Sequence, residues 1–299
     1  MSYLCRVICG VLPLPAAEII PFEPDLCNCN VGKPMTASFL ADCSEIRRKN
    51  PLILCITNYV AMEFNADALL AVGASPLMSL NENEMEQLAL RCSALYVNIG
   101  CPDRHVIAAA EKAVRSVALS GKPWVLDPVG VGVTSLRNAA ALNLMHIYHP
   151  SVIRGNASEI SALAGENSLS SGLESAVAVD EAQKAAVSLA SDIHGTVVVS
   201  GPSDYVTDGH RTVRIHNGSP LMRYVTGAGC TASALCAAFL AVDNDTFTAA
   251  WGAMEMIGCA GQLAAEKCSG SGSLKAGIVD ELCNCAPEAY VPILQYETD

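Results

Sequence analysis

The sequence predicts an α/β fold with a mostly parallel central sheet and helices on both faces. Short strands that are apolar throughout alternate with helical segments along most of the chain. Such strands are typical of a parallel sheet that is buried on both sides. The composition agrees, because 51% of the 299 residues are hydrophobic and only 16% are charged, as in a close-packed globular chain.

The expected elements can be placed in order along the chain. Apolar runs bounded by turn residues predict strands at 52–56, 94–99, 124–126, 151–153 and 196–200. Helical patterns, two of them stopped by Gly73 and Gly121, predict helices at 62–72, 81–93, 104–120, 136–145 and 180–193. The segments 205–207 and 212–216 flank an Asp-Gly turn and predict an antiparallel hairpin at the edge of the sheet. Residues 230–267 are rich in Ala, Gly and Cys and are expected to form buried helices.

The domain organisation is expected to be simple. Residues 1–35 are expected to be an irregular N-terminal extension, and 36–299 a single domain without a separate lid. The extension holds a short apolar patch behind Arg6 that could be interpreted as a signal peptide, but Pro13 and Pro15 interrupt it. We therefore favour an extension of unknown role over a targeting segment. No apolar run has the length of a membrane span.

Charge and cysteine content exclude several classes of protein. The formal net charge of −12 argues against a nucleic-acid-binding protein and against docking on an anionic membrane. The 14 cysteines do not have the spacing of a disulfide framework, and the two Cys-Asn-Cys pairs lack the usual spacing of zinc ligands. Free cysteines inside apolar segments indicate a reducing compartment, and we expect a cytoplasmic protein.

Polar motifs follow four of the predicted strands. They are Thr57-Asn58, Asp127-Pro128, Arg154-Gly155-Asn156 and Ser200-Gly201. Each motif alone is common turn chemistry. Together, they predict a polar ligand site at the edge where the carboxyl ends of the parallel strands meet.

A glycine-rich segment, TGAGCT at 226–231, directly precedes an apolar helix. The backbone N–H groups of Gly227, Ala228 and Gly229 could form a cavity for an anion such as a phosphate. The alternative is a tight loop that only lets a small-residue helix pack deeply, and the residues alone favour it. No P-loop and no dinucleotide-binding glycine motif is present.

Carboxylates near these strand ends suggest a magnesium site. Asp127 and Glu159, with Asn156, offer the hard oxygen ligands that Mg²⁺ prefers. Asn156 and Glu159 also have the spacing of a helix N-cap and its capping-box glutamate. Taken alone, the residues favour the cap.

Five ordered motifs carry a resemblance to a known family. They are PLILCITNYVAMEFNADALLAVGASPLM (51–78), ALYVNIG (94–100), LDPVGVG (126–132), IRGNASEI (153–160) and VTGAGC (225–230). Over roughly residues 40 to 285, the chain resembles hydroxyethylthiazole kinases of the ribokinase-like superfamily. The resemblance implies a ribokinase-like three-layer sandwich and Mg²⁺-dependent transfer of the γ-phosphoryl group of ATP. The implied acceptor is the primary hydroxyl of 4-methyl-5-(2-hydroxyethyl)thiazole, in thiamine salvage. It also implies a homotrimer with the thiazole pocket at a subunit junction.

The resemblance further implies the roles of individual residues. Asn58 and Met78 would line the thiazole pocket, with Gly227 beside the acceptor hydroxyl. Cys230 would stand where most ribokinase-like enzymes have an aspartate base, and we expect the helix start to lower its thiol pKa. Because phosphoryl transfer needs little early proton transfer, a weak base can suffice there.

The remaining implied roles concern ATP and the metal. Asp127 and Glu159 would act around Mg²⁺ and the phosphates, while Arg154 and Ser200 would contact ATP. The family more often has threonine in place of Ser200, and serine keeps the hydroxyl.

Three rival functions stay open: a kinase of another hydroxymethyl heterocycle (a pyrimidine or pyridoxal), a nucleotide-dependent dehydratase on the same fold, and a non-catalytic thiol-rich binding protein. The dehydratase normally has an aspartate in the GAG motif, where this chain has Cys230.

Overall fold

The computed structural model describes residues 34–165, 176–284 and 286–298. Most of the predicted irregular extension, and all of its signal-like patch, lies outside these residues. The described chain begins with helix α1, Pro34–Lys49. None of the helices in these three ranges is long and apolar enough to cross a membrane.

A central sheet runs through the molecule, and its described strands are in the order β2-β1-β3-β4-β5-β6-β7-β8-β9. The strands are β1 (Leu52–Ile56), β2 (Ser75–Met78), β3 (Ala94–Asn98), β4 (Trp124–Asp127), β5 (Val152–Asn156), β6 (Thr196–Ser200), β7 (Asp204–Thr207), β8 (Thr212–Ile215) and β9 (Tyr296–Thr298). Strands β1 to β6 are parallel, and β6 to β9 pair antiparallel. The carboxyl ends of six strands therefore meet along one edge.

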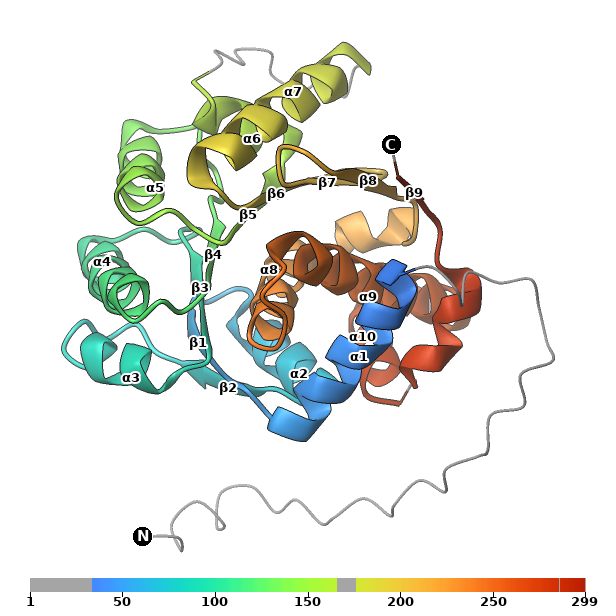
Figure 1. Cartoon of the computed structure of the whole chain (residues 1–299). Coiled ribbons are helices and arrows are strands. Elements are labelled where there is room, and N and C mark those ends of the chain that lie inside the picture. Colours follow the sequence, from blue (N-terminus) through green and yellow to red (C-terminus); the bar gives the residue numbers. More distant parts are fainter. Residues whose placement is uncertain (1–33, 166–175, 285, 299) are drawn as a thin grey trace, which may run out of the picture.

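Helices cover both faces of the sheet (Figure 1). The outer layer consists of α3 (Met85–Arg91), α4 (Arg104–Leu119), α5 (Ser135–Tyr148), α6 (Ala157–Leu163) and α7 (Ala176–Ile193). The inner layer consists of α1, α2 (Met62–Val72), α8 (Ala228–Leu240), α9 (Thr246–Lys267) and α10 (Ser271–Asn284). Short 3₁₀ helices are η1 (Pro220–Tyr224), η2 (Pro287–Ala289) and η3 (Val291–Ile293). The predicted three-layer α/β architecture is confirmed.

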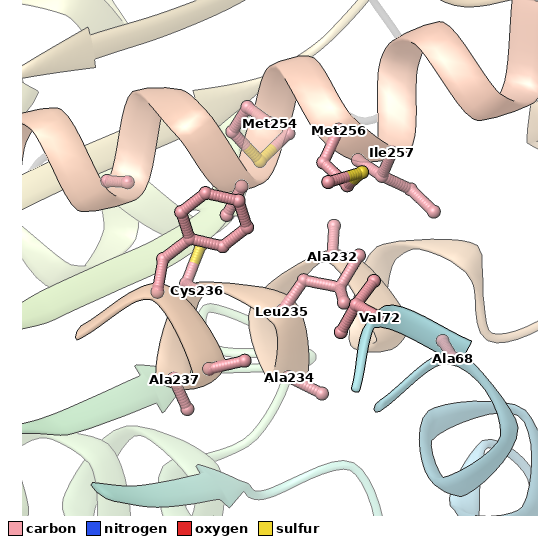
Figure 2. Close-up of a cluster of buried hydrophobic side chains, with 14 of the residues drawn as sticks. Ala68, Val72, Ala232, Ala234, Leu235, Cys236, Ala237, Met254, Met256 and Ile257 are labelled. Carbon is pink, nitrogen blue, oxygen red and sulfur yellow. The ribbon is translucent and has the colours of Figure 1, made fainter. Parts of the chain in front are cut away.

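Two helices of the inner layer, α8 and α9, are buried on nearly all sides. A core of apolar side chains from α2, α8 and α9 fills the space between them (Figure 2). Small residues make this packing close: a Cβ atom added at Gly252 of α9 would lie 2.8 Å from the ring of Phe239 in α8. The expectation of buried helices in 230–267 is confirmed, and their packing holds the start of α8 against the sheet.

Several predicted elements need correction. Helix α3 begins at Met85 rather than at 81, because Asn81 and Ser79 bond to the backbone N–H groups of Asn83 and Asn81 and so stabilise a turn instead. Arg154 and Gly155 do not follow a strand but lie within β5, paired with Val198 and Val199.

The edges of the sheet also differ from the prediction. The hairpin of β7 and β8 is present, but β9 pairs with β8 and forms the edge in its place. Helix α1 and strand β2 were not predicted. Strand β2 is half-buried along its whole length and contains Pro76, so it lacks the apolar run that identified the central strands.

Candidate functional site

The predicted polar side chains lie where the parallel strands end and helix α8 begins. In the middle of the sheet, Asn98 ends β3 and Asp127 ends β4, and the two residues are register partners. Asn156 and Ser200 end β5 and β6 and are register partners as well. Asn58 follows β1. The sheet therefore brings these groups to one edge, as the strand-end motifs predicted.

The start of α8 has no side-chain cap. Gly227 occupies the N-cap position at φ +89°, a left-handed conformation that glycine adopts without strain. A Cβ atom at Gly227 would lie 3.3 Å from Cβ of Ala61, so the loop passes close to α2. The N–H group of Ala228 donates to Val225 at 3.1 Å. This N–H group is therefore not free to bind an anion, and the prediction that Ala228 contributes to an anion cavity is wrong.

Two N–H groups of this first turn remain available. Thr231 N donates to the carbonyl of Gly227, whereas the N–H groups of Gly229 and Cys230 have no acceptor among the described residues. Free N–H groups at a helix start favour an anion, through both hydrogen bonding and the helix dipole. The N–H groups that could bind an anion here are therefore those of Gly229 and Cys230, and Gly227 shapes the loop.

Arg154 lies beside this helix start. Its side chain projects from β5 and is 8% exposed. A Cβ atom at Gly229 would lie 3.3 Å from Nη1 of Arg154, so the guanidinium group lies close to the backbone of this turn. The Nε atom of Arg154 is buried and has no hydrogen-bond partner. A buried, unsatisfied cationic donor is costly, and an anion bound at the start of α8 would satisfy it.

Asp127 is the buried acid of the site, at 2% exposed. Its Oδ2 atom accepts hydrogen bonds from the hydroxyl of Tyr96 at 3.0 Å and from Nδ2 of Asn98 at 2.7 Å. Burial raises the pKa of Asp127 to about 6, the positive charge of Arg154 lowers it, and the negative charge of Glu159 raises it. The carboxyl group is therefore mostly ionised at neutral pH.

Glu159 caps helix α6. Its Oε2 atom accepts from the N–H group of Asn156 at 2.9 Å, while Oδ1 of Asn156 accepts from the N–H group of Glu159 at 2.9 Å. Its Oε1 atom accepts from the N–H group of Gly130 at 2.8 Å. The capping box that the spacing suggested is present. The same carboxylate also acts electrostatically on Asp127.

The two carboxylates fit a magnesium ion that arrives with a nucleotide. Mg²⁺ binds hard oxygen ligands, typically one or two carboxylates together with phosphate oxygens and water. Asp127 and Glu159 supply such a pair. Across the described ranges, no group of three or more His, Cys, Asp or Glu side chains could hold a metal by itself, and Mg²⁺ in a nucleotide site does not require one.

Cys230 lies in the first turn of α8, half-buried between two asparagines. Its Sγ atom accepts hydrogen bonds from Nδ2 of Asn98 at 3.2 Å and from Nδ2 of Asn58 at 3.5 Å. The pKa of Cys230 is raised by burial and by the charge of Asp127, although both asparagines and Arg154 lower it. The expectation that the helix start lowers this pKa is therefore wrong, because burial outweighs the favourable donors.

The remaining predicted residues, Met78, Asn58 and Ser200, lie on either side of Asp127 along the sheet. Met78 ends β2, and Asn58 holds its loop by accepting from the N–H groups of Val60 and Ala61. On the opposite side, Ser200 ends β6 and its hydroxyl donates to the carbonyl of Gly155 at 3.2 Å. Among the described residues, no hydrogen bond connects Met78 or Ser200 to Cys230 or Asp127.

Sequence reasoning missed Tyr96, Asn98 and Asn65. Asn65 of α2 bonds to Thr57 and Thr231 and so ties α2 to the end of β1 and to α8. Tyr96 and Asn98 belong to the quoted motif ALYVNIG, whose strand end carries a polar residue just as the other strand ends do. From this polar strand end, Asn98 could have been predicted as a site residue.

Comparison with known proteins gives consistent matches. The model of the hydroxyethylthiazole kinase family matches residues 43–288. A hydroxyethylthiazole kinase of Leptospira biflexa is 42% identical over 81% of this chain and 91% of its own, and one of Brachyspira hyodysenteriae is 43% identical over 80% and 90%. The structure of a hydroxyethylthiazole kinase protein from Pyrococcus horikoshii matches with a TM-score of 0.81 and 34% identity, over 87% of this chain and 98% of the other. A pyridoxal kinase from Staphylococcus aureus, with a TM-score of 0.56 and 18% identity over 71% and 88%, shares the fold.

Proposed function

The chain belongs to the hydroxyethylthiazole kinase family, and from that premise we propose how its own residues carry out the reaction. The protein is a kinase with the ribokinase-like fold that uses ATP to phosphorylate the alcohol of hydroxyethylthiazole. Residues 36–299 act as one catalytic unit.

The observation that carries the assignment of the site is the unpartnered cation beside an uncapped helix. Arg154 has a buried Nε atom without an acceptor, and the adjacent turn of α8 has free N–H groups at Gly229 and Cys230. Both features favour an anion. The γ-phosphoryl group of ATP, which gains charge on its outer oxygens during transfer, is the anion that a kinase binds there.

The two substrates approach this turn from opposite sides. Asn58, Met78 and Gly227 form the side of β1 and β2, and they line the pocket for the thiazole alcohol. Arg154 and Ser200, on β5 and β6, form the side that holds ATP. This division follows the strand order, which puts Met78 and Ser200 at opposite flanks of Asp127.

Asp127 and Glu159 would hold Mg²⁺ together with the phosphates, and the bound ion would neutralise phosphate charge and so favour transfer. The alcohol oxygen forms a new bond to the γ-phosphorus, the bond from that phosphorus to the β–γ bridging oxygen breaks, and ADP leaves. Late in the transfer, the hydroxyl proton passes to the thiolate form of Cys230, which becomes the thiol. Because the pKa of Cys230 is raised, only a small fraction of the group is thiolate at neutral pH, and orientation with charge stabilisation supplies most of the rate.

Exposed apolar side chains support a homotrimer with the pocket at a subunit junction. Tyr59 and Val60, directly after Asn58, are 68% and 63% exposed, and Tyr224, just before the glycine-rich loop, is 59% exposed. Apolar groups of this size beside a site are typical of a contact surface. Light scattering on the purified protein gives the mass of the assembly. A monomeric mass at working concentration would contradict the trimer.

The experiment that tests the function is release of ADP from Mg-ATP, with and without the thiazole alcohol. We expect turnover that depends on the alcohol. A panel with a hydroxymethylpyrimidine and pyridoxal then tests the acceptor, since the shared fold alone admits such kinases. Turnover with one of these and none with the thiazole would contradict the proposed acceptor. Absence of turnover with every alcohol would contradict the kinase.

A further inference from the structure

Asn98 connects the two groups on which the proposed reaction depends. It ends β3 and is 1% exposed. Its Nδ2 atom lies 2.7 Å from Oδ2 of Asp127 and 3.2 Å from Sγ of Cys230. Among the described residues, Asn98 is the side chain that hydrogen-bonds to both the acid and the thiol.

The orientation of the Asn98 amide follows from its neighbours. Its Oδ1 atom lies 2.8 Å from the backbone nitrogen of Gly100, which can only donate, and 3.0 Å from Nδ2 of Asn58. The oxygen must therefore face these donors. The NH₂ group is left to face Asp127 and Cys230, and the hydroxyl of Tyr96 lies within reach at 3.0 Å while it donates to Asp127.

The chain around Asn98 leaves it no room to move. A Cβ atom at Gly100 would lie 2.8 Å from Oδ1 of Asn98 and 3.0 Å from Nδ2 of Asn58. The backbone after β3 thus closes over both amides. A side chain held in this way can fix the position of its partners, since a lost contact would leave buried donors unsatisfied.

We propose that Asn98 is a positioning residue for phosphoryl transfer, whose amide holds the Cys230 thiol and the Asp127 carboxylate in fixed relation to each other. The sulfur atom accepts N–H groups from Asn98 and Asn58, and this pair of contacts keeps Cys230 in one rotamer beside the anion cavity. Asn98 touches neither substrate in this role. The inference deepens the proposed function and rests on it for the identity of the reaction.

A double-mutant cycle tests the role in the full-length enzyme. Asn98→Ala is expected to lower kcat roughly tenfold, as misplacement of a reacting group does, with the KM values for ATP and the alcohol within about twofold. In the Cys230→Ala background the same change is expected to cost only about twofold, because one of the two partners that Asn98 positions is already absent and only Asp127 remains. Asn98→Asp keeps the shape of the side chain but loses the donor, and it is included in case Asn98→Ala folds poorly.

Asn217→Ala is the matched control. Asn217 is also buried, at 9% exposed, and its amide bonds to the Gln262 side chain and to the backbone of Ile293 and Gln295, which are not part of the proposed site. It is expected to lower the melting temperature as Asn98→Ala does, with kcat near that of the wild type. Equal losses of kcat in both variants, or full additivity of the Asn98 and Cys230 changes, would overturn the proposal.

A second measurement does not depend on turnover. Alkylation of Cys230 by iodoacetamide at fixed pH, followed on its peptide by mass spectrometry, is expected to slow at least about threefold in Asn98→Asp, because a carboxylate beside the sulfur disfavours the thiolate. Asn217→Ala is expected to leave the rate unchanged. An unchanged rate in Asn98→Asp would overturn the contact itself. Wild-type enzyme without alcohol-dependent turnover would overturn only the proposed function, because the alkylation result would still decide the positioning.

Discussion

Helices α6 and α8 both begin at the edge of the sheet where the strands end, but their first turns are built in different ways. In α6, Asn156 and Glu159 bond to each other's backbone N–H groups. In α8, Gly227 supplies no side-chain cap, and the N–H groups of Gly229 and Cys230 remain free. Side-chain oxygens of the protein thus accept from N–H groups at the start of α6. At the start of α8, the free N–H groups could donate to the oxygens of a ligand.

The two helix starts also differ in the charged group that lies beside them. Arg154 packs against Gly229 of α8, and its Nε atom is buried without a partner. At α6, by contrast, the carboxylate of Glu159 is part of the capping box. A helix start that is capped by its own side chains stabilises the fold, whereas a helix start beside a cation and without a cap favours a bound anion. Substitution of the Asn156 cap should therefore change stability, and substitutions at the start of α8 should change phosphate binding.

The largest effect is expected from Arg154→Met, which keeps much of the volume and removes the charge. Loss of a preorganised donor to the transferring group lowers kcat/KM by roughly 10²–10³-fold. The control is Arg214→Met: Arg214 lies in β8, stacks on Tyr205 at 5.3 Å and bonds to Gln183, away from the site. Steady-state kinetics with varied ATP separates the two. An unchanged ATP KM and kcat in Arg154→Met would show that the start of α8 does not bind phosphate.

Gly227→Ala should have the next largest effect. Alanine at φ +89° is strained, and its Cβ would press on Ala61 at 3.3 Å, so the loop and the N–H groups behind it must shift. We expect kcat/KM to fall by on the order of 10²-fold, as for a misplaced catalytic donor.

Gly121→Ala is a matched control for strain at Gly227. Gly121 also has a positive φ, of +64°, but nothing lies within 4 Å of an added Cβ. It should lose stability without losing activity. If both variants lower the melting temperature equally and neither lowers kcat/KM, the shape of the α8 start does not matter for catalysis.

The first turn of α6 could be predicted from the sequence more fully than the first turn of α8, for a physical reason. The capping box of α6 is local, since Asn156 and Glu159 lie three residues apart and determine each other's geometry. The strands 52–56 and 196–200 were likewise predicted with their observed bounds, because each is a short apolar run ended by polar turn residues.

The start of α8 could be predicted only in part. The glycines predicted a close approach of backbone, but which N–H groups stay free depends on Val225 and on Arg154 from another strand. The raised pKa of Cys230 depends on burial by the whole inner layer, which a local motif does not contain. Asn98 was missed for the same reason, because its partners are 29 and 132 residues away in sequence.

A smaller effect is expected from Cys230→Ala, within the first turn of α8. A thiol with a raised pKa contributes little proton transfer, so kcat should fall only roughly tenfold, below the ~10²–10⁴ of a strong general base. Cys230→Asp should keep or raise kcat, since a carboxylate is ionised at neutral pH and can accept the proton, whereas the thiol is mostly protonated. Single-turnover kinetics at saturating ATP measures both. A correctly folded Cys230→Ala enzyme without any activity would instead indicate a covalent intermediate on the sulfur.

Glu159→Gln tests whether the capping carboxylate of α6 also acts on the site. The negative charge of Glu159 raises the pKa of Asp127, which is about 6. Removing that charge lowers this pKa, so Asp127 stays ionised to lower pH and the acidic limb of kcat/KM against pH should move downward. The metal pair is weakened at the same time, and the Mg²⁺ requirement should rise about tenfold. Glu82→Gln, which removes a carboxylate paired with Lys112, should move neither quantity.

Asn156→Ala should have the smallest effect on turnover, because it removes a cap and nothing that a ligand needs. Its Oδ1 atom accepts the N–H group of Glu159, and loss of this bond should cost about 1 kcal/mol of unfolding free energy. That corresponds to a fall of about 2–4 °C in melting temperature. Asp103→Ala removes the equivalent cap of α4, where Oδ1 accepts from His105 and Val106, and should give a similar fall. If Asn156→Ala raised the KM for ATP several-fold while Asp103→Ala did not, the start of α6 would belong to the ligand site. The contrast between a capped start that stabilises the fold and an uncapped start that binds the ligand would then be contradicted.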